Sequence, residues 1–155
     1  MKTRRMMLSV LALCFVAAMC FAADDAQMGT WKLNEAKSKI GAGAPKNSTV
    51  VYEAAGDSVK VTVDGTNSDG TPLHNEWTGK FDGKDYPVTG DQSQDMRSYK
   101  RINARTLALT VKKDGKVTNS GRIAVAADGK SRTVKTTSTN PKGKKVSSTA
   151  VYDKA

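Results

Sequence analysis

The sequence predicts an all-β protein in which antiparallel strands follow one another as an up-and-down meander, closed or nearly closed into a barrel. Five Asp-Gly pairs, at 64–65, 69–70, 82–83, 114–115 and 128–129, suit the positive backbone angles of tight hairpin turns. Runs rich in Val, Thr, Tyr and Leu lie between these pairs, and several alternate apolar and polar residues. After residue 22 no stretch keeps a helical period, which excludes a mainly helical fold.

Reading between the turns predicts ten strands, at 29–33, 48–54, 58–64, 72–80, 85–88, 96–102, 106–112, 116–125, 131–138 and 145–152. One face of each strand is expected to be buried, most clearly for Val59, Val61 and Val63, for Leu107, Leu109 and Val111, and for Val117, Ile123 and Val125. Between the first two strands, the stretch from Asn34 to Ile40 fits at most one helical turn. A sandwich is the alternative architecture, but it predicts longer crossing connections than this chain offers.

Residues 1–22 have the three parts of a secretory signal peptide, with cleavage expected after Ala22. Lys2, Arg4 and Arg5 form the basic front, and an apolar run of 16 residues from Met6 to Phe21 follows. That run is shorter than the roughly 20 residues of a spanning helix, so release is favoured over a permanent membrane anchor. We therefore expect a periplasmic or secreted protein with one domain at 23–155, free of any transmembrane anchor after cleavage.

Both cysteines, Cys14 and Cys20, fall inside the predicted signal peptide. The mature chain would therefore contain no disulfide, no thiolate metal ligand and no cysteine nucleophile.

Charge is distributed unevenly along the chain, which carries a formal net charge of +10. Residues 92–155 hold 15 basic and 4 acidic residues, whereas residues 23–91 hold 7 basic and 11 acidic ones. Such an asymmetry indicates either an anionic partner, such as an envelope surface, or an ordinary solvated surface. Nucleic acid is not expected as a partner, because the basic half lacks ordered aromatic platforms and the protein is predicted to be exported.

Few residues are available for catalysis or for metal binding. His74 is the only histidine, and it shares a strand face with Glu76 and Lys80 that is expected to point to solvent. No nucleophile-elbow sequence is present, and one histidine is too few for a histidine-based zinc site. The oxygen-rich run 64–70 misses the EF-hand spacing and is more typical of a hairpin loop. We expect a protein that is not an enzyme and that needs no cofactor or metal.

Several side chains are candidates for the interior of the barrel. Trp31, Leu73, Trp77 and Phe81 are expected to point inward, either as plain core or as surfaces on which a ligand stacks. The ninth and tenth strands carry small or polar residues on one face, which indicates either a roomy, partly wet cavity or loose packing. These residues are Thr136, Ser138, Ser148 and Ala150.

The two faces of strand 96–102 compete for the interior. Met96, Ser98 and Ile102 lie on one face, and Arg97, Tyr99 and Arg101 lie on the other. We expect the apolar face to point inward, because buried unpaired arginines are costly. The opposite arrangement would place two guanidinium groups beside a tyrosine and create an anion site.

The opening residues Gly29-Thr30-Trp31-Lys32-Leu33 resemble the G-x-W opening of lipocalins and, more closely, the G-T-W-K-L opening of intracellular fatty-acid-binding proteins. The ending 149–155 is similar to the closing strand of the latter, where Arg-x-Tyr holds a ligand carboxylate. In this chain Tyr152 carries over, but Ala150 stands in the position of the arginine. The segment 34–47 is also too short for the helical lid of that family. The resemblance implies an exported, bacterial lipocalin-like barrel with a ligand of its own.

Arg132 is a candidate for supplying the cation that is missing at Ala150. It shares the parity of Val134 and Thr136, so its side chain either enters the barrel from the ninth strand or reaches solvent at the strand end. The first function we infer is noncatalytic binding of a small, partly apolar or amphipathic anionic ligand in the interior. The alternative is an interaction module with a filled barrel and no ligand. It would contact an anionic surface through Lys112, Lys113, Lys142, Lys144 and Lys145.

Overall fold

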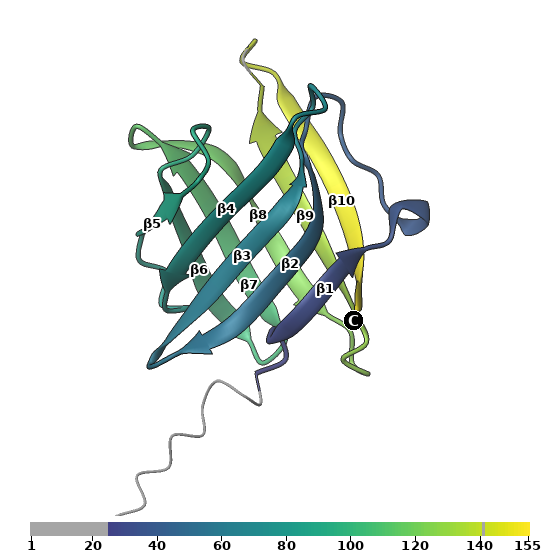
Figure 1. Cartoon of the computed structure of the whole chain (residues 1–155), viewed down its shortest axis with the longest axis vertical. Coiled ribbons are helices and arrows are strands. Elements are labelled where there is room, and N and C mark those ends of the chain that lie inside the picture. The colour runs from purple at the N-terminus through teal and green to yellow at the C-terminus, as the bar shows by residue number, and fades with distance from the viewer. Residues whose placement is uncertain (1–24, 141) are drawn as a thin grey trace, which may run out of the picture.

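The computed structural model describes residues 25–140 and 142–155, in which ten antiparallel strands form a closed barrel (Figure 1). Each strand pairs with its neighbours in the chain, and β1 also pairs with β10, so no edge is left open. The strands are β1 Gly29–Leu33, β2 Lys46–Ala55, β3 Ser58–Thr66, β4 Pro72–Gly79, β5 Tyr86–Thr89, β6 Met96–Asn103, β7 Thr106–Lys113, β8 Lys116–Val125, β9 Ser131–Thr139 and β10 Lys145–Lys154.

All ten predicted strands are present, and their ends differ from the prediction by at most two residues. The closed meander also shows that the sandwich alternative is wrong. The signal peptide and cleavage site predicted at 1–22 lie outside the described residues. Within the described part of the chain, no helix has the length and apolar character needed to span a membrane.

The connection between β1 and β2 contains a single turn of 3-10 helix, η1 Glu35–Lys37. The side chain of Asn34 starts it by accepting a hydrogen bond from the backbone N–H of Lys37. Lys39 then pairs with Thr149, which holds the connection along the edge of β10. The prediction of at most one helical turn is confirmed.

Four of the five Asp-Gly pairs lie in turns, where Gly70, Gly83, Gly115 and Gly129 have positive φ angles. The hairpin predicted at 64–65 is wrong, because Gly65 lies inside β3 and the chain turns only after Thr66. This glycine serves a different purpose. A Cβ atom on it would lie 2.0 Å from the carbonyl oxygen of Lys46, so its absence allows β2 and β3 to approach closely beside a β-bulge.

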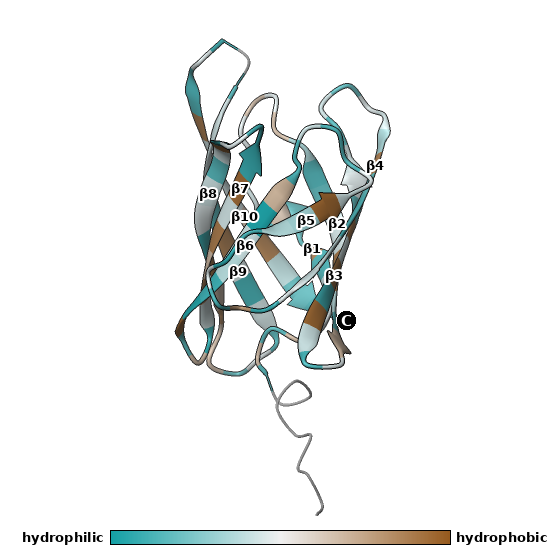
Figure 2. Ribbon diagram, turned by 90° about the vertical axis from the view of Figure 1, so that its left-hand side faces the viewer, coloured by the Kyte–Doolittle hydropathy of each residue, from teal (hydrophilic) through white to brown (hydrophobic). Residues whose placement is uncertain are grey.

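The two ends of the barrel differ. The first described residues meet the barrel at the lower end in Figure 1, where the C-terminus also lies, and we call this the closed end. The β1–β2, β5–β6 and β9–β10 connections lie at the opposite, open end. Hydrophobic and hydrophilic bands alternate along individual strands in Figure 2, as expected when one face of a strand points into the barrel.

The predicted alternation holds over most of the barrel and fails where a bulge intervenes. Val61, Val63 and Leu107 are buried as expected. Val117 is 53% exposed, so its expected inward position is wrong. The β7–β8 register shifts between Val111 and Lys112, and this irregularity reverses the parity of β8 at its first residues.

Candidate functional site

The barrel encloses a cavity of about 460 Å³, within the range of small-molecule sites. Apolar side chains from six strands contribute to its wall, namely Val50, Val63, Leu73, Leu109, Val111, Ile123 and Val134. Polar residues gather toward the open end, where Asn47, Asp91, Ser93, Gln94, Asn119 and Asn140 contribute to the lining. The interior therefore has an apolar wall and a polar mouth. Of the two readings of the small-residue face of β9 and β10, a roomy cavity is correct.

Arg132 enters this cavity from β9 near the closed end. Its residue is 2% exposed, and its guanidinium lies over three aromatic rings. The ring centroids of Trp31, Tyr52 and Tyr152 are 4.9, 4.8 and 5.0 Å from its Cζ atom. These faces attract the cation, but they accept no conventional hydrogen bond from it.

The guanidinium of Arg132 has no anionic partner among the described residues. Its Nε and Nη1 atoms are buried and make no hydrogen bond there, and no carboxylate forms a salt bridge with it. Tyr152 does not act as a counter-anion, because burial raises the pKa of its hydroxyl to about 12 although Arg132 favours the ionised form. The cavity thus contains a buried positive charge with two nitrogen atoms whose N–H groups have no acceptor.

A second arginine, Arg97, lies on β6 near the open end and is fully engaged. Its Nη2 atom donates to the side-chain oxygens of Asn75 at 2.9 Å and of Gln94 at 2.7 Å. Its Nη1 atom donates to the hydroxyl of Tyr99 at 3.4 Å, and burial raises the pKa of that hydroxyl, so Tyr99 stays neutral.

Asp91 supplies the negative charge of this network. Gln94 donates to its carboxylate at 2.6 Å and Asn75 at 3.4 Å. Partial burial opposes ionisation of Asp91, but hydrogen bonds from Ser93 and Gln94 outweigh that effect and hold the pKa of the carboxyl below its ordinary value. Arg97 is therefore tied, through two amides, to a nearby carboxylate, and the network fixes the β5–β6 loop at the mouth.

The expectation for strand 96–102 is wrong in its main point. Met96 and Ile102 are 38% and 43% exposed, whereas Arg97 and Tyr99 are buried. Two contributions stabilise this orientation. The Tyr99 ring is buried with its centroid 4.7 Å from that of Trp77, and the Arg97 guanidinium is hydrogen-bonded. The alternative anion site is also not formed as described, because Arg101 lies at the closed end and does not line the cavity.

Trp31, Trp77 and Phe81 point into the barrel as predicted, but none of them lines the cavity. The indole N–H of Trp77 donates to the carbonyl of Arg97 at 2.8 Å, and the Phe81 ring is stacked on Trp77. These rings form packed core, so of the two roles expected for Trp31, Trp77 and Phe81 the structure shows plain core and not a cavity surface on which a ligand stacks. Tyr52 and Tyr99 line the cavity instead. Their rings are edge to face, with the ring centroids 6.2 Å apart.

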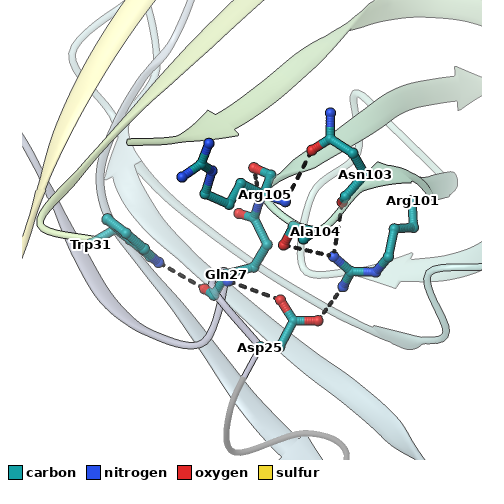
Figure 3. Close-up of polar contacts among 7 residues, drawn as sticks. All are labelled: Asp25, Gln27, Trp31, Arg101, Asn103, Ala104 and Arg105. Atoms are coloured by element: carbon teal, nitrogen blue, oxygen red, sulfur yellow. Dashed lines mark hydrogen bonds and ion pairs between the residues drawn. The ribbon is translucent and has the colours of Figure 1, made fainter. Parts of the chain in front are cut away.

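The segment before β1 seals the closed end (Figure 3). Asp25 forms an ion pair with Arg101, and its carboxylate also accepts the backbone N–H of Gln27 at 2.9 Å. Gln27 in turn donates to the carbonyl of Arg105 and accepts the indole N–H of Trp31 at 2.8 Å. Arg101 thus acts on the seal of the barrel rather than on the cavity.

His74 lies on the outer face, as predicted, where its Nδ1 atom is 2.6 Å from the Oδ1 atom of Asp64. No group of three or more His, Cys, Asp and Glu residues suited to a metal ion occurs in the described ranges. Sequence analysis missed Tyr52, Asn75, Gln94 and Asn119 as cavity residues. Asn75 and Asn119 share the parity of Leu73 and Ile123, which are expected to point inward, so alternation could have found them, whereas Gln94 lies in the β5–β6 loop, where no alternation applies.

No protein-family model matches this chain, and no curated protein matches it in sequence. Among solved structures, it is similar to EF1p2_mFAP2b bound to DFHBI, with a TM-score of 0.51 and 11% identity. That match covers 86% of this chain and 98% of the other. A redesigned beta barrel, mFAP1, bound to DFHBI, matches at a TM-score of 0.44 and 18% identity over 84% of this chain and 98% of its own. The first likeness supports the barrel fold.

Proposed function

We propose that this protein is a noncatalytic barrel that binds a small amphipathic anion in its interior, with the anionic group on Arg132. The observation that carries the proposal is the buried guanidinium of Arg132, a residue that lines the cavity and has two nitrogen atoms without an acceptor. A second contribution comes from the apolar wall between Arg132 and the mouth, which suits an apolar chain or ring system.

The free-energy cost of burying Arg132 favours binding of an anion beside its guanidinium. Burying an unpaired charge costs several kcal/mol, and each cation–π contact returns roughly 0.5–2 kcal/mol. A carboxylate or similar group would accept one hydrogen bond from each of these two nitrogen atoms, and such charge-assisted bonds are the strong ones in a low dielectric. Among interior cations, Arg97 offers no comparable opening, because its donors already have acceptors.

The resemblance to fatty-acid-binding proteins fits this arrangement. Ala150 stands where that family has its arginine, but Arg132 pairs with Tyr152 across β9 and β10. The cation therefore reaches the same tyrosine from the neighbouring strand. The barrel EF1p2_mFAP2b, which shares the fold, is bound to DFHBI, so a barrel of this kind can hold a ligand.

The cellular setting belongs to the same proposal. The basic and apolar segment at 1–22 supports export, so we place the ligand encounter in the periplasm or outside the cell. The alternative function, an interaction module without a ligand, predicts a filled interior. A cavity of about 460 Å³ weighs against it.

The substitution Arg132→Met tests the proposal with dodecanoate as the probe, measured by isothermal titration calorimetry. The wild type should bind dodecanoate, and R132M should bind it at least about tenfold more weakly, since a buried charge-assisted pair is lost. The melting temperature of R132M should equal or exceed that of the wild type, because the variant no longer buries an unpaired cation. Lys135→Met, which removes an exposed cation from the same strand, is the control and should bind normally. Equal affinity of R132M and wild type would refute the role of Arg132.

A further inference from the structure

A second buried polar atom in the cavity lacks a partner. The side-chain oxygen of Asn119 is buried and accepts no hydrogen bond from the described residues, and Asn119 lines the cavity. A buried acceptor without a donor costs free energy, and most such groups in folded proteins are satisfied.

The donors nearest to Asn119 along the strands are already used. The hydroxyl of Thr118 donates to the carbonyl oxygen of Val111 at 3.4 Å. Ser138 pairs with Asn119 across β8 and β9, and its hydroxyl donates to the carbonyl oxygen of Val146 at 3.4 Å. Neither hydroxyl is therefore free to satisfy the Asn119 oxygen, which is left without a donor in a residue that lines the cavity.

Asn119 and Arg132 stand at opposite ends of the cavity. Arg132 pairs with Val125 beside the closed end, whereas Asn119 pairs with Ser138, six residues farther along β9. At roughly 3.3 Å per residue, those six residues span about 20 Å. The apolar side chains of Ile123 and Val134, which pair with each other, lie between the two levels.

The two ends of the cavity are complementary to different groups on a ligand. Arg132 presents donors and a positive charge, so it needs an anionic acceptor. The Asn119 oxygen is an acceptor, so it needs a donor such as a hydroxyl or an amide N–H. Building on the proposed function, we propose that the ligand is a bifunctional acid. Its carboxylate lies deep on Arg132, its middle is apolar, and a hydrogen-bond donor at its far end binds Asn119.

The test compares three ligands of one chain length: dodecanoate, 12-hydroxydodecanoate and 12-methoxydodecanoate, each titrated calorimetrically into the full chain. The wild type should prefer the hydroxy acid to dodecanoate by about threefold to tenfold, the worth of one net hydrogen bond. It should show no such preference for the methyl ether, which accepts a hydrogen bond but donates none. This comparison needs no variant.

Two variants locate the effect. Asn119→Leu, nearly the same size but apolar, should bind 12-hydroxydodecanoate no more tightly than it binds dodecanoate, so the preference measured within this one variant is lost. Thr118→Val is the matched control, because the Thr118 hydroxyl is already committed to a backbone carbonyl. It should keep the preference, and thermal unfolding verifies that both variants fold.

The outcomes separate this inference from the proposed function. If the wild type binds all three acids equally, or if N119L keeps the preference, the donor site at Asn119 is refuted while the anion site stands. If none of the three acids binds the wild type, the proposed function itself fails.

Discussion

Three aromatic faces surround the guanidinium of Arg132, and two of its nitrogen atoms are without acceptors. Aromatic faces lower the cost of burying the cation but leave its hydrogen-bonding capacity unused. A neutral apolar molecule would leave both nitrogen atoms unsatisfied, so the proposed site should prefer an anion. Stability and binding are expected to oppose one another at this residue, which is why R132M should be stable and yet bind poorly.

His74 offers a test of the electrostatics on the outer face. The hydrogen bond that the protonated His74 ring donates to the Asp64 carboxylate raises the pKa of His74 above its ordinary value of 6.5. A raised pKa in the folded state means that the pair stabilises the fold below pH 6.5, and that this contribution is lost as the pH rises through the folded value. Since the chain has one histidine, its NMR titration is unambiguous.

Asp64→Asn should bring the pKa of His74 back toward 6.5. Glu76→Gln serves as the comparison, because Glu76 lies 3.8 Å from the other ring nitrogen and should have the smaller effect. An unchanged titration of His74 in the Asp64→Asn variant would contradict the observed pairing.

At the residue scale, sequence patterns placed some side chains correctly and others not. Arg132 was assigned the correct parity, because β9 is regular from its first residue. The orientation of β6 differs from the prediction, because the expected free-energy cost of burying Arg97 assumes an unpaired guanidinium. In the structure, Asn75 and Gln94 accept its hydrogen bonds. Those acceptors come from β4 and from the β5–β6 loop, so only the tertiary structure shows that the guanidinium is satisfied.

At the scale of elements, the closed end depends on a short segment rather than on a strand. Asp25 to Met28 bridges β6, the β6–β7 turn and β1 through the ion pair with Arg101 and the hydrogen bonds of Gln27. Because the indole N–H of Trp31 is held by this segment, the rate at which that proton exchanges reports on the seal.

Arg101→Met should loosen this seal. The variant loses the ion pair with Asp25 and the contact of the guanidinium with the Phe81 ring, 5.3 Å away. We expect a loss of about 1–2 kcal/mol in unfolding free energy, less than for a fully buried pair because Arg101 is partly exposed. Hydrogen exchange at the Trp31 indole should be faster in this variant.

Lys46→Met is the control, because it removes a cation from the exposed pair with Glu35. It should change stability by less than about 1 kcal/mol and leave the exchange of the Trp31 indole proton unaltered. Slow indole exchange in R101M would show that the segment before β1 does not depend on Arg101.

Strand positions were predictable because Asp-Gly turns and period-two alternation act locally, within a few residues. Irregularities were not predictable in the same way. The exposure of Val117 depends on a bulge in the pairing of β7 with β8, and the role of Gly65 depends on its approach to the Lys46 carbonyl. Both are properties of two paired strands, and neither can be predicted from the sequence of one strand alone.

At the scale of the whole molecule, the interior has a polarity gradient along the barrel axis. An unpaired cation lies near the closed end, an apolar wall lies in the middle, and a neutralised polar network surrounds the mouth. Closure of the barrel through β1 and β10 makes this possible, because it supplies an inward face from every strand without an exposed edge. The sequence predicted the closed meander, whereas the gradient follows from the combined register of ten strands.

The binding of an anion by Arg132 is tested most directly by an NMR spectrum of the protein with ¹⁵N-labelled arginine, recorded during titration with dodecanoate. The Nε–H of Arg132 has no acceptor among the described residues, and R132M assigns its signal. We expect dodecanoate to shift this signal strongly and to slow its exchange with water, while the Nε–H of Arg97, already bonded to Gln94, changes little. Binding of dodecanoate with no change in the Arg132 signal would contradict the proposal that the anionic group of the ligand binds Arg132.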